Sequence, residues 1–496
     1  MQKRRLLINA LMSVAQVLTV GAGYAFLYRF LLARIGAERI GIWSVVIAAT
    51  SVANAANLGL SASTIKFVAK YLALGREETV SGVVQTTVVT LSLFSGAVLL
   101  AVYPFSEWIF RHIVPASRLA ETASLLPYVF FSMWLMVVGS VFLAGLDGCQ
   151  RIDIRAGLVM SGTLIFLALS FVFVPGHGLI GLAYARIAQD GFTLVGGWLM
   201  LKRRLRPLPV FCFKWDKRLF REMLGYGVNF QLISVSVIFC DPLTKGMLAR
   251  FGGLGMAGIY EMASRMIGQL KALLVTAGQA LVPAIADLHE NEPETVQKLY
   301  DNSYRLIFYI AVPYFSIIIA LIPVICEWWI GYYNGVFVSL SVMLAVGWFI
   351  NTLCAPAYFA NLGIGGLGWN TAAHVVMAAL NITLGLLLGR FFGGMAVAAA
   401  WMFSLIVGSI IIIVSYHIKN GVPLKNTLPS EHMGVAVTGL AAIFVSALIY
   451  RVCENRANIF ETACLILLAN FLVMFIPAWR HPMRRKLLGW LTAELF

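Results

Sequence analysis

The chain has 496 residues, of which 60% are hydrophobic and only 12% are charged, and its formal net charge is +15. Soluble proteins carry roughly 25% charged residues, so this composition excludes an ordinary water-soluble fold and indicates that lipid solvates much of the surface. The positive charge lies in short segments between apolar runs, as in membrane proteins, so we expect no nucleic-acid partner.

Fourteen apolar runs are long enough to cross a membrane as helices, each of which needs about 20 residues. A membrane-spanning strand would alternate in polarity and last only about ten residues. The predicted spans cover residues 8–32, 40–62, 80–103, 122–147, 155–175, 179–201, 225–249, 256–284, 301–325, 336–360, 369–389, 393–416, 433–450 and 458–479. We therefore expect an all-α polytopic membrane protein with about 14 transmembrane helices.

The distribution of Lys and Arg predicts the orientation of these spans. A cytoplasmic N-terminus places 24 of the 37 Lys and Arg residues at the cytoplasmic side and 8 at the external side. This is the bias that the positive-inside rule describes. No cleavable signal peptide is recognised, and an even number of spans returns the C-terminus to the cytoplasm. The expected location is the cell inner membrane.

The longest cytoplasmic connection, residues 202–221, contains eight cations. They are Lys202, Arg203, Arg204, Arg206, Lys214, Lys217, Arg218 and Arg221. We interpret the segment as a topology anchor and a linker between halves, and the alternative is a binding site for anionic lipid headgroups.

An internal repeat divides the chain. Residues 34–80 resemble residues 250–296, with an offset of 216 at both ends and 217 at Gly41 and Gly258. Each copy would hold six spans, so both copies enter the membrane in the same orientation. We expect two parallel six-helix halves around a central cavity, at residues 1–207 and 208–430, followed by residues 431–496 with two further helices and a basic tail.

Sequence motifs for enzymatic chemistry are missing. The two G-x-G-x-x-G patterns, at Gly176 and Gly363, fall between spans instead of between a strand and a helix, so we interpret them as helix-end and packing glycines. No G-K-[ST], H-E-x-x-H or G-x-S-x-G motif occurs, and no cofactor or metal site is expected. A membrane glycosyltransferase or polymerase would need catalytic residues in an external loop, and residues 104–121 offer few.

Eight ionisable residues fall within the predicted spans, where an unpaired charge costs several kcal/mol. Six of them form pairs four residues apart, which places both members on one helix face: Arg186 with Asp190, Asp241 with Lys245, and Glu261 with Arg265. Arg29 and Lys271 have no acidic residue at that spacing.

The cations among these residues predict an anion-binding cavity. The eight residues carry a net charge of +2, which suits the diphosphate of a lipid-linked sugar. The predicted substrate-binding residues are Arg29, Lys245, Arg265 and Lys271. For Arg29 and Lys245, extension of the side chain to the external interface is an equally simple interpretation.

Two stretches resemble a known family. Leu32-Ala-Arg-Ile-Gly-Ala-Glu-Arg-Ile-Gly41-Ile-Trp43 and Asn57-Leu-Gly59-Leu-Ser-Ala-Ser-Thr-Ile-Lys66-Phe-Val-Ala-Lys70 are similar to the start of the Wzx-type oligosaccharide flippases. These flippases belong to the multidrug/oligosaccharidyl-lipid/polysaccharide exporter superfamily. Asp241, Gly252-Gly253, Gly258-Ile-Tyr260 and Pro283 fit the family pattern at spans seven and eight.

The resemblance implies a function in surface polysaccharide biosynthesis. Such a flippase moves an undecaprenyl-diphosphate-linked oligosaccharide across the inner membrane by alternating access, driven by H⁺ or Na⁺ and without enzymatic chemistry. Asp190, Asp241 and Glu261 are the candidates for ion coupling because they are acidic and lie within spans. The alternative is an ion-coupled multidrug exporter, although those relatives typically have twelve spans.

Overall fold

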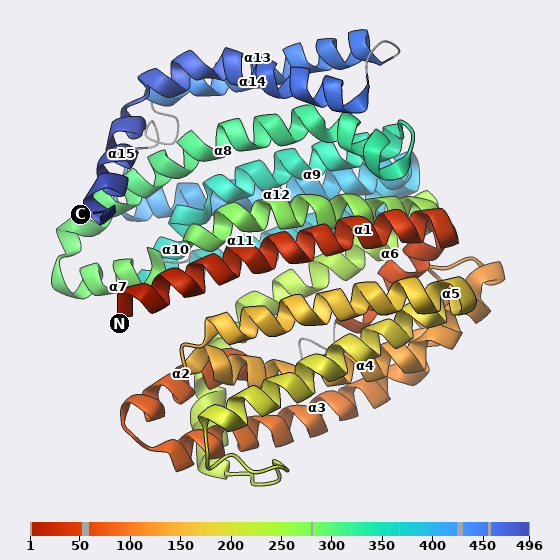
Figure 1. Cartoon of the computed structure of the whole chain (residues 1–496), viewed down its shortest axis with the longest axis vertical. Helices are drawn as coiled ribbons and strands as arrows, with labels where there is room; N and C mark the ends of the chain where they lie inside the picture. Colours follow the sequence, from red (N-terminus) through yellow and green to blue (C-terminus); the bar gives the residue numbers. More distant parts are fainter. Residues whose placement is uncertain are drawn as a thin grey trace. The chain divides into compact units, whose positions relative to one another are not determined.

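The computed structural model describes residues 2–51, 59–278, 281–366, 368–423, 430–454 and 458–495. In these ranges the chain is helical and contains no strand (Figure 1). The helices are α1 (Gln2–Ser51), α2 (Leu60–Ala73), α3 (Glu77–Arg111), α4 (Ala116–Gly148), α5 (Ile152–Arg204), α6 (Lys217–Gly278), α7 (Leu281–Asn291), α8 (Pro293–Ile330), α9 (Gly335–Leu353), α10 (Ala355–Ile364), α11 (Gly368–Phe392), α12 (Gly394–Lys419), α13 (Ser430–Cys453), α14 (Ile459–Arg480) and α15 (Pro482–Leu495).

The described helices account for the predicted spans. Ten of them are long and apolar enough to cross a membrane. Two of the ten, α1 and α5, break within their length and each match two predicted spans, and α6 matches spans seven and eight. The predicted all-α polytopic fold is confirmed. Predicted spans 40–62 and 256–284 run in part through residues 52–58 and 279–280, which lie outside the described residues.

Glycines produce the three breaks. Gly36, Gly178 and Gly253 all have a positive φ, a backbone conformation that side-chain-bearing residues rarely adopt. Gly36 (φ 78°, ψ 168°) and Gly253 (φ 83°, ψ 164°) share one conformation. The two copies of the repeat are therefore equivalent at an offset of 217 here, where the sequence alone aligned Gly36 with Gly252.

The glycines of the two G-x-G-x-x-G patterns serve as predicted, at helix ends and close contacts. Gly178 forms the break in α5, and Gly365 ends α10 in the left-handed conformation. A Cβ atom at Gly181 would lie 2.4 Å from the Phe173 carbonyl oxygen. These positions require glycine for backbone geometry, with no need of a dinucleotide.

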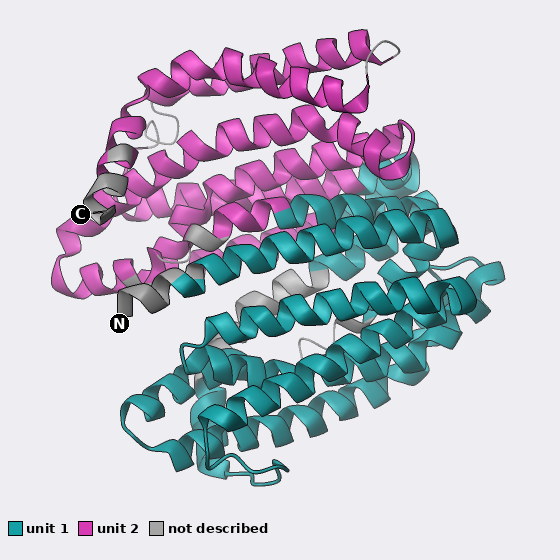
Figure 2. Cartoon of the chain, viewed as in Figure 1, with its two compact units in different colours: residues 1–269, 382–397 teal, residues 270–381, 398–496 magenta. Residues whose placement is uncertain are grey.

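The chain packs as two compact units (Figure 2). Unit 1 contains residues 1–269 and 382–397, and within it α5 packs on both α1 and α4. Unit 2 contains residues 270–381 and 398–496, and within it α13 and α14 pack on each other and on α8. These units are defined by which helices pack together. The predicted domain boundaries at residues 207 and 430 follow the sequence repeat instead, and they remain a prediction.

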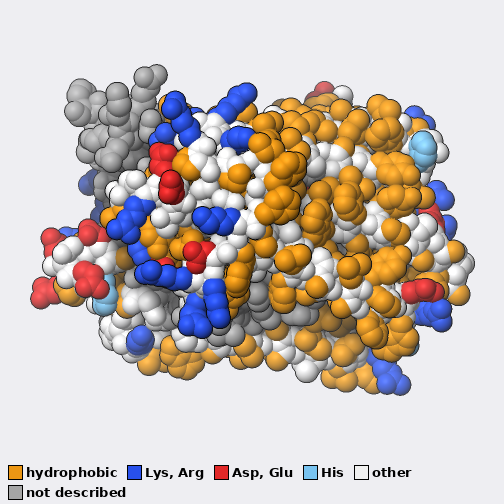
Figure 3. All heavy atoms as spheres, turned by 90° about the horizontal axis from the view of Figure 1, so that it is seen from below, with side chains coloured by type: hydrophobic (Ala, Val, Ile, Leu, Met, Phe, Trp, Pro, Cys, Tyr) orange, Lys and Arg blue, Asp and Glu red, His pale blue; other side chains and the backbone are white. Residues whose placement is uncertain are grey.

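Apolar side chains cover much of the outer surface. On α13, Leu440 and Phe444 are 70% and 66% exposed, and on α14, Phe471 and Leu472 are at least 60% exposed. Figure 3 shows hydrophobic side chains over most of one face, with Lys and Arg gathered mainly toward one end. Soluble monomers rarely expose apolar patches of this extent, so these surfaces face lipid.

Candidate functional site

Two glycines bring equivalent segments of α1 and α6 into backbone contact within unit 1. A Cβ atom at Gly41 would lie 1.9 Å from the Leu254 carbonyl oxygen, and one at Gly258 would lie 2.1 Å from the Ala37 carbonyl oxygen. Counted from the breaks at Gly36 and Gly253, these two contacts are the same contact seen from either side. Such a self-complementary contact is the signature of a twofold arrangement.

The two segments run in the same direction. Gly41 lies against Gly258, and three residues further along each helix the Ser44 hydroxyl donates a hydrogen bond to Glu261 at 2.8 Å. Because both helices advance together, the axis that relates them runs along the helices and not across them. This is the relation expected of two parallel repeats.

Glu261 is the centre of a polar cluster beside this contact. Its side chain is 3% exposed, and each of its carboxylate oxygens accepts from two donors. The Oε1 atom accepts from the Tyr28 hydroxyl at 3.0 Å and from Arg265 Nε at 2.7 Å. The Oε2 atom accepts from the Ser44 hydroxyl at 2.8 Å and from Lys245 Nζ at 2.8 Å. A buried carboxylate is tolerated only with such partners.

Lys245 joins Glu261 to Asp241. The Lys245 side chain is 5% exposed, and its Nζ lies 2.6 Å from Asp241 Oδ2. The Asp241 side chain is 50% exposed. The predicted pairs Asp241–Lys245 and Glu261–Arg265 are both confirmed, and the alternative in which Lys245 extends to the membrane surface is wrong.

The third predicted pair is confirmed on α5. Arg186 Nε donates to Asp190 Oδ2 at 3.0 Å, and the Ser132 hydroxyl donates to the same oxygen at 2.5 Å. The remaining nitrogens of Arg186 reach Gln189 Oε1 at 3.3 Å and Met136 Sδ at 3.6 Å. Asp190 is 5% exposed, so this carboxylate is buried against α4.

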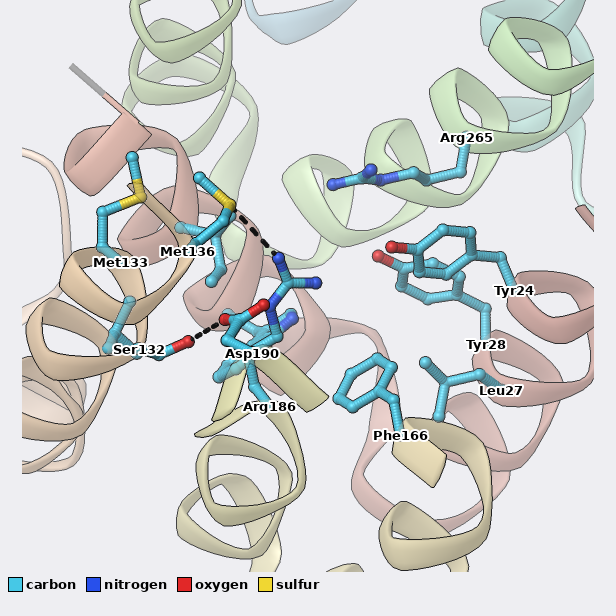
Figure 4. Close-up of a pocket in the computed structure, with 13 residues that line it drawn as sticks. Tyr24, Leu27, Tyr28, Ser132, Met133, Met136, Phe166, Arg186, Asp190 and Arg265 are labelled. Carbon is cyan, nitrogen blue, oxygen red and sulfur yellow. Dashed lines mark hydrogen bonds and ion pairs between the residues drawn. The ribbon is translucent and has the colours of Figure 1, made fainter. Parts of the chain in front are cut away.

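A cavity of about 270 Å³ lies within unit 1 beside the Arg186–Asp190 and Glu261–Arg265 pairs (Figure 4). It is lined by Tyr24, Leu27, Tyr28, Trp43, Ile47, Val129, Ser132, Met133, Met136, Phe166, Arg186, Asp190 and Arg265. Figure 4 shows the guanidinium groups of Arg186 and Arg265 directed into it from α5 and α6. Arg265 Cζ lies 5.1 Å from the Tyr24 ring centroid, and Arg186 Cζ lies 5.9 Å from that of Phe166.

This arrangement can bind an anion. Arg265 uses its Nε on Glu261, and its side chain remains 36% exposed. A guanidinium group presents five donors in a fixed plane and matches the geometry of phosphate. The cavity wall carries two guanidinium groups and one carboxylate, so its formal charge is positive.

The other predicted substrate-binding cations lie elsewhere. Arg29 is exposed on α1. Lys271 belongs to unit 2, where its Nζ lies 3.5 Å from the Trp348 ring centroid. The structure thus brings Lys245 and Arg265 together around Glu261, and it adds Arg186, which the predicted binding set omitted.

The neutral members of the site were not predicted from the sequence. Tyr28 and Ser44 lie eight residues before and after Gly36, as Lys245 and Glu261 lie eight residues before and after Gly253. An alignment of the two repeats on Gly36 and Gly253 could therefore have identified Tyr28 and Ser44 as the counterparts of Lys245 and Glu261. Among the described residues, no group of three or more His, Cys, Asp and Glu side chains could hold a metal ion.

Unit 2 contains an apolar pocket of about 520 Å³. It is lined by Tyr304, Phe308, Val312, Phe315, Ser316, Ile319, Val346, Phe349, Ile350, Leu353, Ile406, Ile410, Ile413, Ala436, Gly439, Leu440 and Ile443. Its walls come from α8, α9, α12 and α13, and they offer hydrocarbon contacts with few polar groups.

Comparison with known proteins agrees with this architecture. The chain is 22% identical over 394 residues, or 77% of its length and 91% of the relative's, to a Shigella flexneri protein named "Putative O-antigen transporter". The lipid II flippase MurJ in an inward closed conformation superposes with a TM-score of 0.74 at 15% identity, over 96% of this chain and 99% of MurJ. An inward-facing multidrug resistance MATE transporter superposes with a TM-score of 0.72 at 15% identity, over 83% of this chain and 98% of that one.

These structural neighbours establish the fold. A family of polysaccharide biosynthesis proteins matches residues 9–289, which include both breaks of the repeat, at Gly36 and Gly253, and the whole Glu261 cluster. The match covers more than half of the sequence, and the chain therefore belongs to the polysaccharide biosynthesis protein family.

Proposed function

We propose that the protein is a flippase that moves an undecaprenyl-diphosphate-linked oligosaccharide from the inner to the outer leaflet of the cell inner membrane. Both termini would lie in the cytoplasm, as the distribution of Lys and Arg predicts. The similarity to the Shigella flexneri protein named "Putative O-antigen transporter", over 91% of that relative, supports a lipid-linked sugar as the substrate.

The observation that carries this proposal is the pair of guanidinium groups in the unit 1 cavity. Arg265 and Arg186 both reach the cavity, and the aromatic rings of Tyr24 and Phe166 lie against them. A diphosphate would take charge-assisted hydrogen bonds from the guanidinium groups, and the aromatic rings would stack on sugar faces.

The apolar pocket of unit 2, taken by itself, has a lining that suits a polyprenyl chain. Its lining is almost entirely aliphatic and aromatic, and it contains residues of α13, which lies outside the repeat. The lipid II flippase covers 96% of this chain, which leaves about 20 residues unmatched. Because α13 has 24 residues and α14 has 22, the similarity extends into both helices.

A multidrug exporter is the second candidate, supported by the structural similarity to MATE transporters. Export of cationic drugs would favour a net-acidic cavity, whereas here the guanidinium groups of Arg186 and Arg265 outnumber the one lining carboxylate, that of Asp190. Glu261 accepts four donors and has no oxygen free for a cationic ligand. Of the three acidic candidates for ion coupling, the half-exposed Asp241 and the cavity-lining Asp190 are therefore better placed than Glu261.

Flipping in proteoliposomes tests the proposal. The purified protein should expose an undecaprenyl-diphosphate-linked oligosaccharide to a glycosidase added outside the vesicles. Arg265→Gln should reduce substrate binding about ten- to a hundredfold, the loss expected for one charge-assisted contact. Arg265→Lys should keep part of the activity, because the charge remains and the planar geometry is lost.

The controls separate binding from folding. Arg250→Gln removes an exposed cation from the same helix and should flip at the wild-type rate. Lys245→Gln leaves Asp241 and Glu261 short of a partner, so it is compared with the double change Asp241→Asn with Lys245→Gln. Arg29→Gln and Lys271→Gln test the two predicted cations outside the cavity. Full flipping by both Arg186→Gln and Arg265→Gln would contradict the proposed site.

A further inference from the structure

A second cavity of unit 1 lies among the basic residues next to the linker between the halves. Its volume is about 830 Å³. It is lined by Lys70, Tyr71, Leu74, Arg76, Lys217, Arg218, Arg221 and Glu222, which we term the basic pocket. The lining comes from the end of α2, the turn before α3 and the first turns of α6.

Hydrogen bonds fix the walls of the basic pocket. The Asp216 carboxylate accepts from the backbone N–H groups of Arg218 at 2.8 Å and Leu219 at 3.2 Å, which caps the start of α6. The buried Ser63 hydroxyl of α2 donates to the Met223 carbonyl oxygen of α6 at 2.8 Å. The cations therefore converge from three segments on one preformed surface.

The one carboxylate of the basic pocket is already engaged. Glu222 accepts from Lys70 Nζ at 3.0 Å through one oxygen and from the Tyr71 hydroxyl at 3.1 Å through the other. The hydrogen bond from Lys70 is the main cause that lowers the pKa of Glu222, so this carboxylate is ionised at neutral pH.

Four further cations in the pocket have no carboxylate partner within the described chain. They are Arg76, Lys217, Arg218 and Arg221, and all four are exposed. Five cations face one carboxylate in this cavity, and the excess charge is positive.

We propose that the basic pocket binds the phosphate group of a membrane lipid at the cytoplasmic surface. The inference rests on the proposed function for the orientation of the spans. A topology anchor needs only cations near the ends of spans, whereas here cations from separate segments surround one cavity. Arg and Lys side chains that converge in this way are typical of phosphate sites.

Neighbouring aromatic residues indicate a lipid instead of a soluble phosphate. Phe211 and Phe213 of the same linker are 71% and 81% exposed, and their rings stack with centroids 5.9 Å apart. Exposed aromatic rings beside cations are typical of the membrane–water interface. Two lipids carry the required group: an anionic phospholipid and the diphosphate-linked substrate as it arrives at the inner leaflet.

Lipid binding to the purified full-length protein, measured by native mass spectrometry, tests this site without any flipping step. The probes are cardiolipin, undecaprenyl diphosphate and, as a neutral lipid, phosphatidylcholine. The triple change Arg76→Gln, Arg218→Gln and Arg221→Gln should weaken binding of at least one phosphate lipid by about tenfold or more. Glu222→Gln should strengthen it, because the pocket loses its negative charge.

The matched control removes the same amount of charge from the linker beside the basic pocket. Arg203, Arg204 and Arg206 are exposed and lie outside the basic pocket, so changing all three to Gln should alter binding less than about twofold. Loss confined to cardiolipin would assign a phospholipid, and loss confined to undecaprenyl diphosphate would assign substrate arrival. Equal losses in the two triple variants, or no loss in either, would overturn the proposal whether or not the protein flips its substrate.

Discussion

The segments around Gly36 and Gly253 share a backbone and differ in charge. Positions at equal distances from these glycines pair as Tyr24 with Asp241, Tyr28 with Lys245, Gly41 with Gly258, Ser44 with Glu261, and Ala48 with Arg265. The break and the close contact occur in both copies. Among these five pairs, all four charged side chains occur in the second copy, and the first copy supplies neutral groups that contact them.

A duplicated scaffold thus holds an asymmetric site. Gly41 and Gly258 fix the crossing of the two helices, and that requirement is identical on both sides of the axis. Tyr28 and Ser44 then donate to Glu261, while the Tyr24 ring lies beside Arg265. The proposed substrate, a lipid-linked sugar, has no twofold symmetry, so an asymmetric set of charges suits it better than a symmetric pair would.

The largest expected effect on stability follows from removing the charge of Glu261, the carboxylate that the neutral groups of the first copy contact. Glu261→Gln leaves Lys245 and Arg265 close together with no buried carboxylate between them. Breaking a buried ion pair typically costs about 3–5 kcal/mol. We expect a loss of this size in the free energy of unfolding, measured by denaturant titration of the purified protein.

A charge-neutral exchange controls for that result. The combination Asp241→Tyr, Lys245→Tyr, Glu261→Ser and Arg265→Ala gives the second copy the residues of the first. Because no unpaired buried charge remains, stability should return close to that of the wild type, while flipping is lost. A combined variant as unstable as Glu261→Gln alone would show that the charges hold the fold.

A smaller loss is expected from breaking the shared contact. In Gly41→Ala or Gly258→Ala, the added methyl group would overlap a backbone carbonyl oxygen of the opposite helix, which cannot move aside as a side chain can. Overpacking typically costs about 1–3 kcal/mol. Each variant should lower the thermal unfolding temperature of the purified protein by several degrees.

Gly255 provides the control for the glycine contact. It lies on α6, as Gly258 does, and a Cβ atom there would meet no neighbour within 4 Å, so Gly255→Ala should leave the unfolding temperature unchanged or raise it slightly. If Gly41→Ala were as stable as Gly255→Ala, the two helices would not approach as closely as the structure has them.

The sequence predicted the spans and the three ion pairs because both depend on local spacing. Run length determines a span, and a separation of four residues places Asp241 beside Lys245 whatever surrounds the helix. The long-range partners of Glu261 could not be found in this way. Tyr28 and Ser44 lie more than 200 residues away, and neither charge nor local spacing distinguishes them from other hydroxyl side chains. The position of Lys271 in unit 2 likewise depends on packing.

The smallest expected effect concerns one neutral donor of the first copy. Ser44→Ala removes one of the four hydrogen bonds to Glu261, and the other three donors keep the carboxylate ionised and buried. The free energy of unfolding should fall by about 1 kcal/mol, the typical net value of one hydrogen bond. Ser170→Ala is the matched control, because Ser170 is also buried in unit 1 and its hydroxyl donates only to the Phe166 carbonyl oxygen of its own helix. The free energy of unfolding of Ser170→Ala should be close to that of the wild type, since the Phe166 carbonyl oxygen still accepts its helical backbone hydrogen bond. Equal losses in the two variants would mean that Ser44 contributes only packing, and the contribution of the first copy to the charged cluster would then reduce to Tyr28 and the Tyr24 ring.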